Sequence, residues 1–177
     1  MTETQNPFFT AYHTPHQTAP FHLIKMEHYE PAILQGMEEQ NKEIEAIISN
    51  PEEPTFANTI VALEKSGNLL NRVSTVFGNL MSAETCDEME ALAEKLMPML
   101  TEHSNNITLN KALFARIDHV YTSPEKPTLS VEENALLENT YRSFVRCGAK
   151  LSGEDKEKFR SISPTVYVGS ISSTVSE

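Results

Sequence analysis

Apolar residues recur three and four positions apart through most of this chain, and that spacing places them on one face of an α-helix. The stripes are Ile33, Met37, Ile44 and Ile48; Leu70, Val73, Phe77 and Leu80; Met89, Leu92, Leu96 and Met99, with the polar His103 continuing the same period; Leu113, Phe114, Ile117 and Val120; and Leu136, Leu137, Tyr141, Phe144 and Val145. The pattern predicts an all-α fold of about six or seven helices in antiparallel hairpins, preceded by an extended N-terminal arm.

Residues that favour helix ends mark the boundaries of these helices. Three pairs have the spacing of a capping box, namely Thr85 with Glu88, Ser130 with Glu133, and Ser152 with Asp155. Thr55 is a candidate N-cap and Gly148 a candidate C-cap. The predicted helices cover residues 28–49, 56–83, 85–104, 110–121 and 130–148, with one more after Ser152. Gly67 makes the second either two short helices or one kinked helix, and Pro98 should bend the third.

Three segments follow from this pattern. Residues 1–27 contain three prolines and lack apolar periodicity, so they read as an extended arm. The arm has too many aromatic residues for a free tail, and these should pack on the helices: Phe8, Phe9, Tyr12 and Phe21. Residues 28–163 form the helical domain. Residues 164–177 change to a β-branched, Ser-rich composition after Pro164, and we expect this tail to be disordered.

Net charge argues against several partners. The 177 residues carry 14 Lys and Arg against 25 Asp and Glu, a net charge of -11. Such a chain repels nucleic-acid phosphates and anionic membranes. No apolar stretch reaches the roughly 20 residues that span a bilayer, and residues 1–10 lack the features of a signal peptide. We therefore expect no nucleic acid, no membrane and a cytoplasmic location.

Residues that often carry chemistry form no convincing catalytic set. His13 and His16 are three apart, but in an irregular arm local hydrogen bonds are favoured over a metal site. No histidine has a glutamate three positions before it, which excludes a di-iron bundle. Cys86 and Cys147 are interpreted as reduced, partly buried thiols rather than a disulfide or a nucleophile. No catalytic, cofactor-binding or metal-binding residue is assigned.

Other groups have a functional and a structural reading. His103 and His119 are expected at helix ends, with partial positive charge facing the carbonyl groups. The glutamates of residues 38–45 and 84–94 are favoured as solvated helix faces over an acidic binding patch. Four methionines are favoured as core packing over a peptide-contacting surface: Met81, Met89, Met97 and Met99.

Residues 54–67, which read PTFANTIVALEKSG, resemble an N-terminal signature of the thimet oligopeptidase family of zinc metallopeptidases. Within that family the chain is similar to peptidyl-dipeptidase (dipeptidyl carboxypeptidase) and oligopeptidase A. Further segments follow in the family's order: residues 6–9 (NPFF), 19–21 (APF), 24–32, 76–80 (VFGNL), 97–98 with His103, 113–116 (LFAR), 136–139 (LLEN) and 144–149 (FVRCGA). The resemblance covers roughly residues 6–163. The different tail suggests a truncated or shifted reading frame near Ser163.

The resemblance implies a zinc ion held by a His-Glu-x-x-His motif and a distant glutamate, because residues four apart on a helix reach one metal. Here no histidine is followed by glutamate and no two are four apart: His13, His16, His22, His28, His103 and His119. The chain is therefore expected to be the N-terminal helical part of such an enzyme, lining its substrate channel and inactive alone. Its partners would be the missing catalytic region and, in the intact enzyme, short peptides.

A stand-alone acidic helical module that binds a protein or peptide is the alternative function. A part separated from its enzyme should expose an apolar face and self-associate, whereas an independent module should be a soluble monomer or defined dimer.

Overall fold

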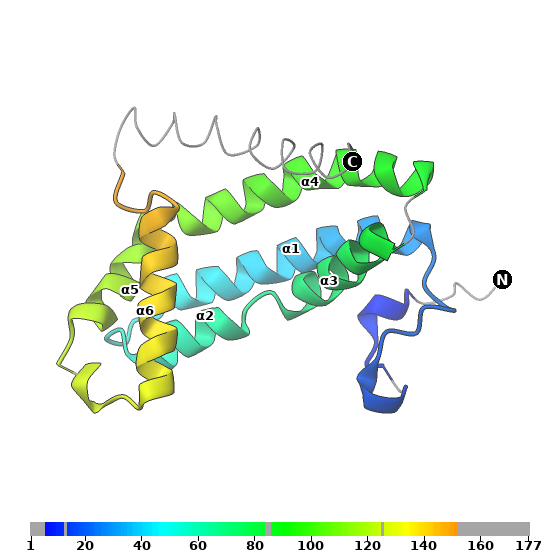
Figure 1. The fold of residues 1–177 in the computed structure, drawn as a ribbon. Helices are drawn as coiled ribbons and strands as arrows, with labels where there is room; N and C mark the ends of the chain where they lie inside the picture. The colour runs from blue at the N-terminus through cyan, green and yellow to red at the C-terminus, as the bar shows by residue number, and fades with distance from the viewer. Residues whose placement is uncertain (1–5, 13, 84–85, 125, 152–177) are drawn as a thin grey trace. The chain divides into compact units, whose positions relative to one another are not determined.

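The computed structural model describes residues 6–12, 14–83, 86–124 and 126–151 (Figure 1). Its elements are η1 (Pro7–Phe9), η2 (Pro15–Gln17), α1 (Met26–Ile48), η3 (Phe56–Val61), α2 (Ala62–Lys65), α3 (Asn68–Ala83), α4 (Asp87–Thr108), α5 (Lys111–Thr122), η4 (Lys126–Thr128) and α6 (Val131–Arg146). These residues form two compact units. The first unit contains the described residues up to Glu43 together with Lys65–Met97, and the second contains Ile44–Glu64 and the described residues from Pro98 on.

The all-α prediction is confirmed, since the described residues contain helices and no strand. Besides the short η3–α2 segment, the described part has five helices of 12 residues or more, which are α1, α3, α4, α5 and α6, slightly fewer than the six or seven predicted. The predicted capping residue Thr85, the helix after Ser152 and the tail of residues 164–177 lie outside the described residues.

Aromatic side chains make the centre of the first unit. Tyr29 in α1 packs between Phe8 of the arm and Phe77 of α3, with both pairs of ring centroids 5.2 Å apart. All three side chains are buried. Arg72 of α3 donates a hydrogen bond to the Phe8 carbonyl, which ties the arm to the helix. The expectation that Phe21 also packs on the helices was wrong, because this side chain is 52% exposed.

Helix α1 was predicted from its stripe, and the structure extends its start by two residues. Within the first unit, Ile33 is buried and Met37 is half-buried, as the helical period predicts. Gly36 lies on the same side, against the backbone of Leu70 in α3. Lys95 in α4 forms an ion pair with Glu30 in α1.

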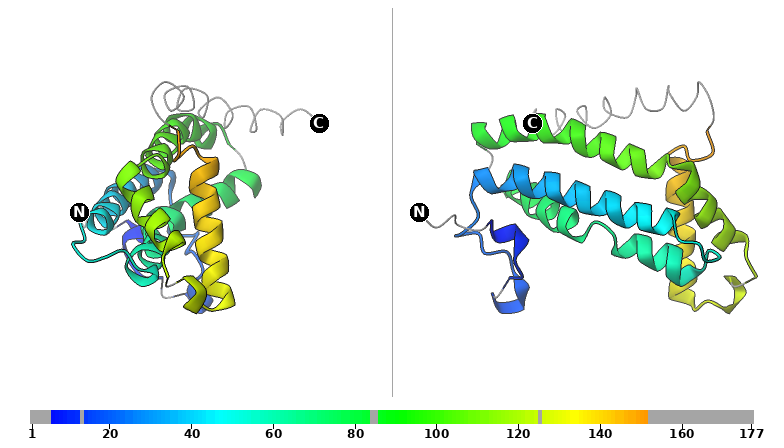
Figure 2. Two further views of the ribbon diagram at one scale, coloured as in Figure 1. Left: turned by 90° about the vertical axis from the view of Figure 1, so that its left-hand side faces the viewer. Right: turned by 180° about the vertical axis from the view of Figure 1, so that it is seen from behind.

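The second unit has its own apolar core. Its buried members come from the end of α1, from η3, from α5 and from α6: Ile44, Ile47, Phe56, Ile60, Leu113, Ile117, Val120, Leu137 and Phe144. Helices α5 and α6 lie side by side and run in opposite directions, as all three ribbon views show (Figures 1 and 2). The α5–α6 pair is thus one of the predicted antiparallel hairpins.

Local sequence signals explain where several helices begin and end. Ser130 and Glu133 form the predicted capping box, with the Ser130 hydroxyl accepting from the Glu133 N–H at 3.2 Å. Gly148 follows α6 at φ +85°, and its N–H donates to the Val145 carbonyl, as a glycine after a helix C-terminus should. Helix α4 continues through Pro98 to Thr108, four residues beyond the predicted end.

Gly67 separates α2 from α3. Its φ of +71° lies in the left-handed region, which side chains with a Cβ rarely adopt. Its N–H donates to the Glu43 carboxylate at 2.7 Å. Of the two alternatives for residues 56–83, the structure therefore has separate helical segments, with glycine at the break.

Candidate functional site

The arm histidines do not converge on a metal site among the described residues. His16 and His22 are exposed, while His13 lies outside the described residues. His28 is buried, and its Nδ1 accepts a hydrogen bond from the Lys25 N–H at 3.0 Å. Its own carbonyl accepts from the Asn6 side chain at 2.8 Å. For His28 the structure thus shows the local hydrogen bonding that was favoured.

The two later histidines differ from each other. His119 lies in the last turn of α5, as expected for a helix-end histidine, and its Nε2 lies 3.3 Å from the Glu53 carboxylate. His103 was expected at a helix end, and this was wrong, because α4 continues to Thr108 and His103 is 5% exposed. Burial lowers the pKa of His103, so the neutral form is favoured there.

Neither cysteine is paired. Cys147 is half-buried, as predicted, but Cys86 is exposed and directly precedes α4, so its predicted burial was wrong. Among the methionines, Met89 is buried and Met81, Met97 and Met99 are half-buried, which agrees best with packing.

The glutamates on α1 are mainly solvated, as favoured. Glu38 forms an i,i+4 ion pair with Lys42 at 2.6 Å, and the hydrogen bond from Lys42 lowers the pKa of Glu38. Glu43 differs from the other glutamates of α1, because its carboxylate accepts a hydrogen bond from the Gly67 N–H. In the described part of the chain no three His, Cys, Asp or Glu side chains are grouped so that they could hold a metal ion. No helix in that part is long and apolar enough to cross a membrane.

Asn58 and Arg116 explain why the PTFANTIVALEKSG segment has its sequence. The Thr55 hydroxyl caps η3 by accepting the Asn58 N–H, and the Asn58 Oδ1 accepts the Thr55 N–H at 2.8 Å. Arg116 of α5 donates to the Asn50 carbonyl at 2.9 Å and to the Asn58 Oδ1 at 3.3 Å. Phe56, Thr59 and Ile60 are buried beside this network. These hydrogen bonds form a structural clamp within the second unit, to which residues 54–64 of the segment belong.

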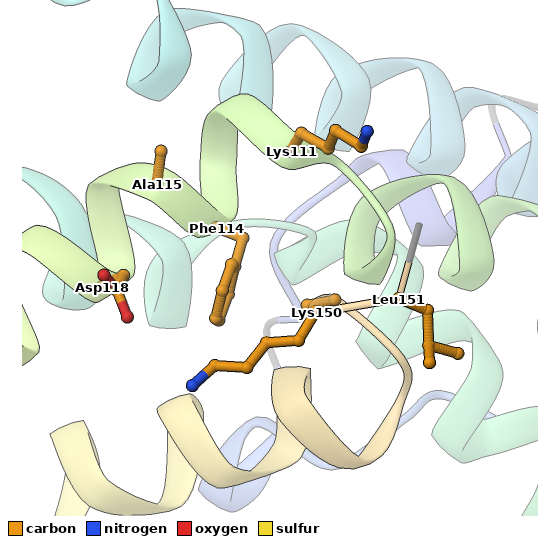
Figure 3. Close-up of a pocket in the computed structure, with 7 residues that line it drawn as sticks. Lys111, Phe114, Ala115, Asp118, Lys150 and Leu151 are labelled. Carbon is orange, nitrogen blue, oxygen red and sulfur yellow. The ribbon is translucent and has the colours of Figure 1, made fainter. Parts of the chain in front are cut away.

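A shallow hollow of about 510 Å³ lies between α5 and the residues that follow α6 (Figure 3). Phe114, Ala115, Ala149 and Leu151 supply its apolar lining. Lys111 and Lys150 add two ammonium groups, and Figure 3 shows the Phe114 ring between these side chains in that view. We call this hollow the α5 groove.

Stacked aromatic rings support the α5 groove. Tyr121 and Tyr141 stack with centroids 3.8 Å apart, and Tyr141 stacks on Phe114 at 5.8 Å. The Tyr141 hydroxyl donates to Asp118 at 3.2 Å, while Lys150 lies over the Tyr141 ring at 5.3 Å. The hydrogen bond with Tyr141 raises the pKa of Lys150, so its ammonium form is favoured. The apolar stripes of the sequence included Phe114 and Tyr141, but they indicated neither Tyr121 nor the lysines around these rings.

A second hollow, of about 940 Å³, lies in the first unit and has a more apolar lining. Met26, Pro31 and Leu34 of α1 and Leu92 of α4 form its apolar part, with Glu27, Glu30, Glu88 and Lys25 at its edges. Leu34 is 40% exposed, and Phe21 and Leu23 of the nearby sequence are 52% and 53% exposed. We call the surface around this hollow the α1 patch. The sequence did not predict where on the helices such a surface would lie.

The described residues thus supply a helical scaffold with two open hollows that have partly apolar linings. Comparison with known proteins gives its family. Residues 31–156 match the family model described as "Neurolysin/Thimet oligopeptidase, N-terminal domain". The chain belongs to the neurolysin/thimet oligopeptidase family, in which it corresponds to the N-terminal domain.

Individual relatives agree with that assignment. The chain is 43% identical over 157 residues to dipeptidyl carboxypeptidase of Escherichia coli (strain K12), covering 89% of this chain and 23% of that protein. It is 41% identical over 155 residues to dipeptidyl carboxypeptidase of Salmonella typhimurium, covering 88% of this chain and 23% of that protein. Identity to oligopeptidase A of Haemophilus influenzae is 27% over 143 residues, or 81% of this chain and 21% of that protein. The chain thus spans about a quarter of the length of these relatives.

Proposed function

We propose that this chain is the N-terminal, channel-lining part of a cytoplasmic zinc-dependent peptidase that releases dipeptides from the C-termini of short peptides. The observation that carries the proposal is the difference in identity between relatives. Identity to a dipeptidyl carboxypeptidase is 43%, whereas identity to an oligopeptidase A is 27%. The helical domain would restrict access to the catalytic region, which belongs to the part of the protein beyond these residues.

The zinc ion of the intact enzyme would be held outside this chain. The sequence has no pair of histidines four apart, and the described side chains do not group around a metal position. The residues described here therefore do not fit the metal, and no step of peptide hydrolysis is assigned to them. Their proposed role is to shape and cover the path of the substrate.

A peptidase assay on the purified 177-residue chain tests this assignment. We expect no release of dipeptides from an unblocked test peptide, with or without added zinc, because the proposed metal ligands are elsewhere. Dipeptidyl carboxypeptidase of Escherichia coli serves as the positive control. Zinc-dependent activity that co-purifies with the chain, and persists after removal of contaminants, would overturn the proposal.

Reading the coding DNA beyond codon 177 in all three frames tests the proposed parent enzyme. A His-Glu-x-x-His stretch a few hundred codons downstream supports a peptidase. Its absence from the three frames would favour the competing function, a helical domain used alone as a binding module.

The α1 patch is the surface at which the missing region, or a second copy in its place, would bind. Leu34, which is 40% exposed, lines it together with Met26, Pro31 and Leu92, so the patch presents apolar side chains to solvent. We expect the isolated chain to self-associate with rising concentration in sedimentation experiments. Leu34→Asp should reduce that association, whereas Val131→Asp, at a more exposed apolar residue in the second unit, should not. A strictly monomeric parent chain would contradict this expectation.

A further inference from the structure

The hollow of the α1 patch lies between two helices of the first unit and has apolar side chains in its lining. Pro31 and Leu34 of α1 are exposed, while Met26 of α1 and Leu92 of α4 are half-buried. Its volume of about 940 Å³ is in the range of pockets that bury a whole ligand. An occupant that fits this hollow therefore presents an apolar face.

The charged side chains around the hollow are mainly acidic. Its lining contains Glu27, Glu30 and Glu88 but a single lysine, Lys25. Lys25 lies 3.6 Å from Glu27, and Lys95 forms an ion pair with Glu30. Glu88 is exposed and has no ion pair among the described residues. Even with Lys95 counted, carboxylates therefore outnumber ammonium groups at the hollow.

The rest of the first unit adds to this negative charge. Residues 1–43 and 65–97 carry eleven Asp or Glu against five Lys or Arg, a net charge of -6. An occupant with Lys or Arg beside its apolar face is attracted to such a surface, and an acidic one is repelled.

A second copy of this chain fits the surface less well than a cationic partner. In a symmetric dimer the same patch meets itself, so the glutamates of one copy approach those of the other. Such a contact covers Leu34 and Leu92 but places like charges together, which opposes binding. The charge of the patch thus favours a partner of opposite sign.

We propose that the α1 patch binds a cationic amphipathic helix, with the apolar face of that helix over Leu34 and Leu92 and its Lys or Arg side chains facing Glu27 and Glu88. The space between α1 and α4 suits a third helix, because amphipathic helices bind in apolar grooves through one face. This inference rests on the proposed function, since the helix would belong to the remaining region of the intact enzyme. The DNA reading tests that enzyme, whereas the binding experiment tests the patch, so the two can fail separately.

A labelled synthetic helix of Leu and Lys, with its leucines on one face, is the probe for this binding. Fluorescence anisotropy follows its titration with the 177-residue chain at physiological salt, and a counterpart with Glu in place of Lys is titrated in parallel. We expect the Leu/Lys helix to bind at least about tenfold more tightly than the Leu/Glu helix. No binding of the Leu/Lys helix to the folded chain, or equal affinity for both helices, would overturn the proposal.

A matched pair of charge reversals separates the patch from a general attraction to an acidic chain. Glu88→Lys should weaken binding of the Leu/Lys helix several-fold. Glu90→Lys changes the net charge equally, at an exposed position of α4 outside the lining of the hollow, and should have a clearly smaller effect. Equal effects of the two substitutions would refute binding at the patch.

Leu34→Asp tests the apolar contact. It should weaken binding of the Leu/Lys helix about tenfold although it adds a negative charge, because the buried leucine is lost. Val131→Asp adds the same charge in the second unit and should not weaken binding. Unchanged or tighter binding in Leu34→Asp would show a purely ionic attraction and contradict the proposal. Self-association through Leu34 with which the Leu/Lys helix does not compete would assign the patch to a second copy, which also refutes it.

Discussion

Gly36 in α1 lies against the backbone of Leu70 in α3, so closely that a Cβ atom at position 36 would be 2.8 Å from the Leu70 nitrogen and 2.9 Å from its Cα. Neither of these backbone atoms can move away as a flexible side chain could. Glycine at this position therefore allows α1 and α3 to approach closely in the first unit, where Tyr29 and Phe77 also join the two helices.

Gly36→Ala should therefore destabilise the chain although alanine favours helices. Forcing the two helices apart should cost about 2 kcal/mol of unfolding free energy. Gly78→Ala is the matched control, because Gly78 lies within α3 with no atom within 4 Å of an added Cβ. That change should stabilise the chain by up to about 1 kcal/mol. Urea denaturation measures both, and equal effects of the two substitutions would contradict the close approach.

Asn58→Ala should destabilise the second unit through the lost clamp. The Asn58 side chain accepts from the Thr55 N–H and from Arg116, and it donates to the Glu53 carbonyl at 2.9 Å. Losing these bonds should cost about 2 kcal/mol. Asn58→Asp keeps the accepting oxygen and should cost clearly less. Thermal unfolding followed by circular dichroism distinguishes the two, and an equally stable Asn58→Ala chain would show that the clamp is dispensable.

Tyr29 should make stability fall at alkaline pH. Burial, with a smaller effect of Tyr12, raises the pKa of Tyr29 from 10.0 to about 12. A raised pKa means that the unfolded chain loses the phenolic proton first. The stabilisation is therefore present below pH 10 and is lost as pH rises through about 12, by roughly 2 kcal/mol.

Tyr29→Phe isolates that contribution. The difference in unfolding free energy between parent and variant should be constant below pH 10 and should shift in favour of the variant between pH 10 and 12. At neutral pH the variant should be no less stable, because the buried Tyr29 hydroxyl has no hydrogen-bond partner among the described residues. A pH-independent difference in denaturant titrations would contradict the prediction.

His103 should make stability fall at acid pH. Burial lowers its pKa below 6.5, so the unfolded chain binds this proton more readily than the folded chain does. Its contribution is present above pH 6.5 and is lost as pH falls through the folded-state pKa. In His103→Gln the loss of stability between pH 7 and 5 should be smaller than in the parent.

An equal loss of stability between pH 7 and 5 in His103→Gln and in the parent would contradict this prediction, because the burial of His103 would then not be its cause.

Much of the local structure could be predicted from short stretches of sequence. The Ser130–Glu133 capping box, the Thr55 cap, the break at Gly67 and the glycine after α6 all involve residues within a few positions of each other. The apolar stripes likewise predicted the buried positions Leu113, Ile117 and Val120. The family resemblance, too, depended on such short segments and was confirmed by the match over residues 31–156.

The incorrect expectations concern exposure that a short stretch does not determine. Phe21 was placed against the helices because it is aromatic, yet it is exposed, whereas Phe8 of the same arm is buried against Tyr29. His103 was placed at a helix end because the apolar stripe stops there, yet α4 continues and the imidazole is buried. In each case the outcome depends on which distant element covers the side chain.

The sequence by itself determined the helical class, the caps, the chain breaks and the absence of a His-Glu-x-x-His motif, because these depend on neighbours along the chain. The tertiary structure decided which helices touch. It brought Gly36 to Leu70, Arg116 to Asn50 and Asn58, and Lys150 over Tyr141. The first two of these associations join residues tens of positions apart, so their geometry follows from how whole helices pack, which no short periodicity encodes.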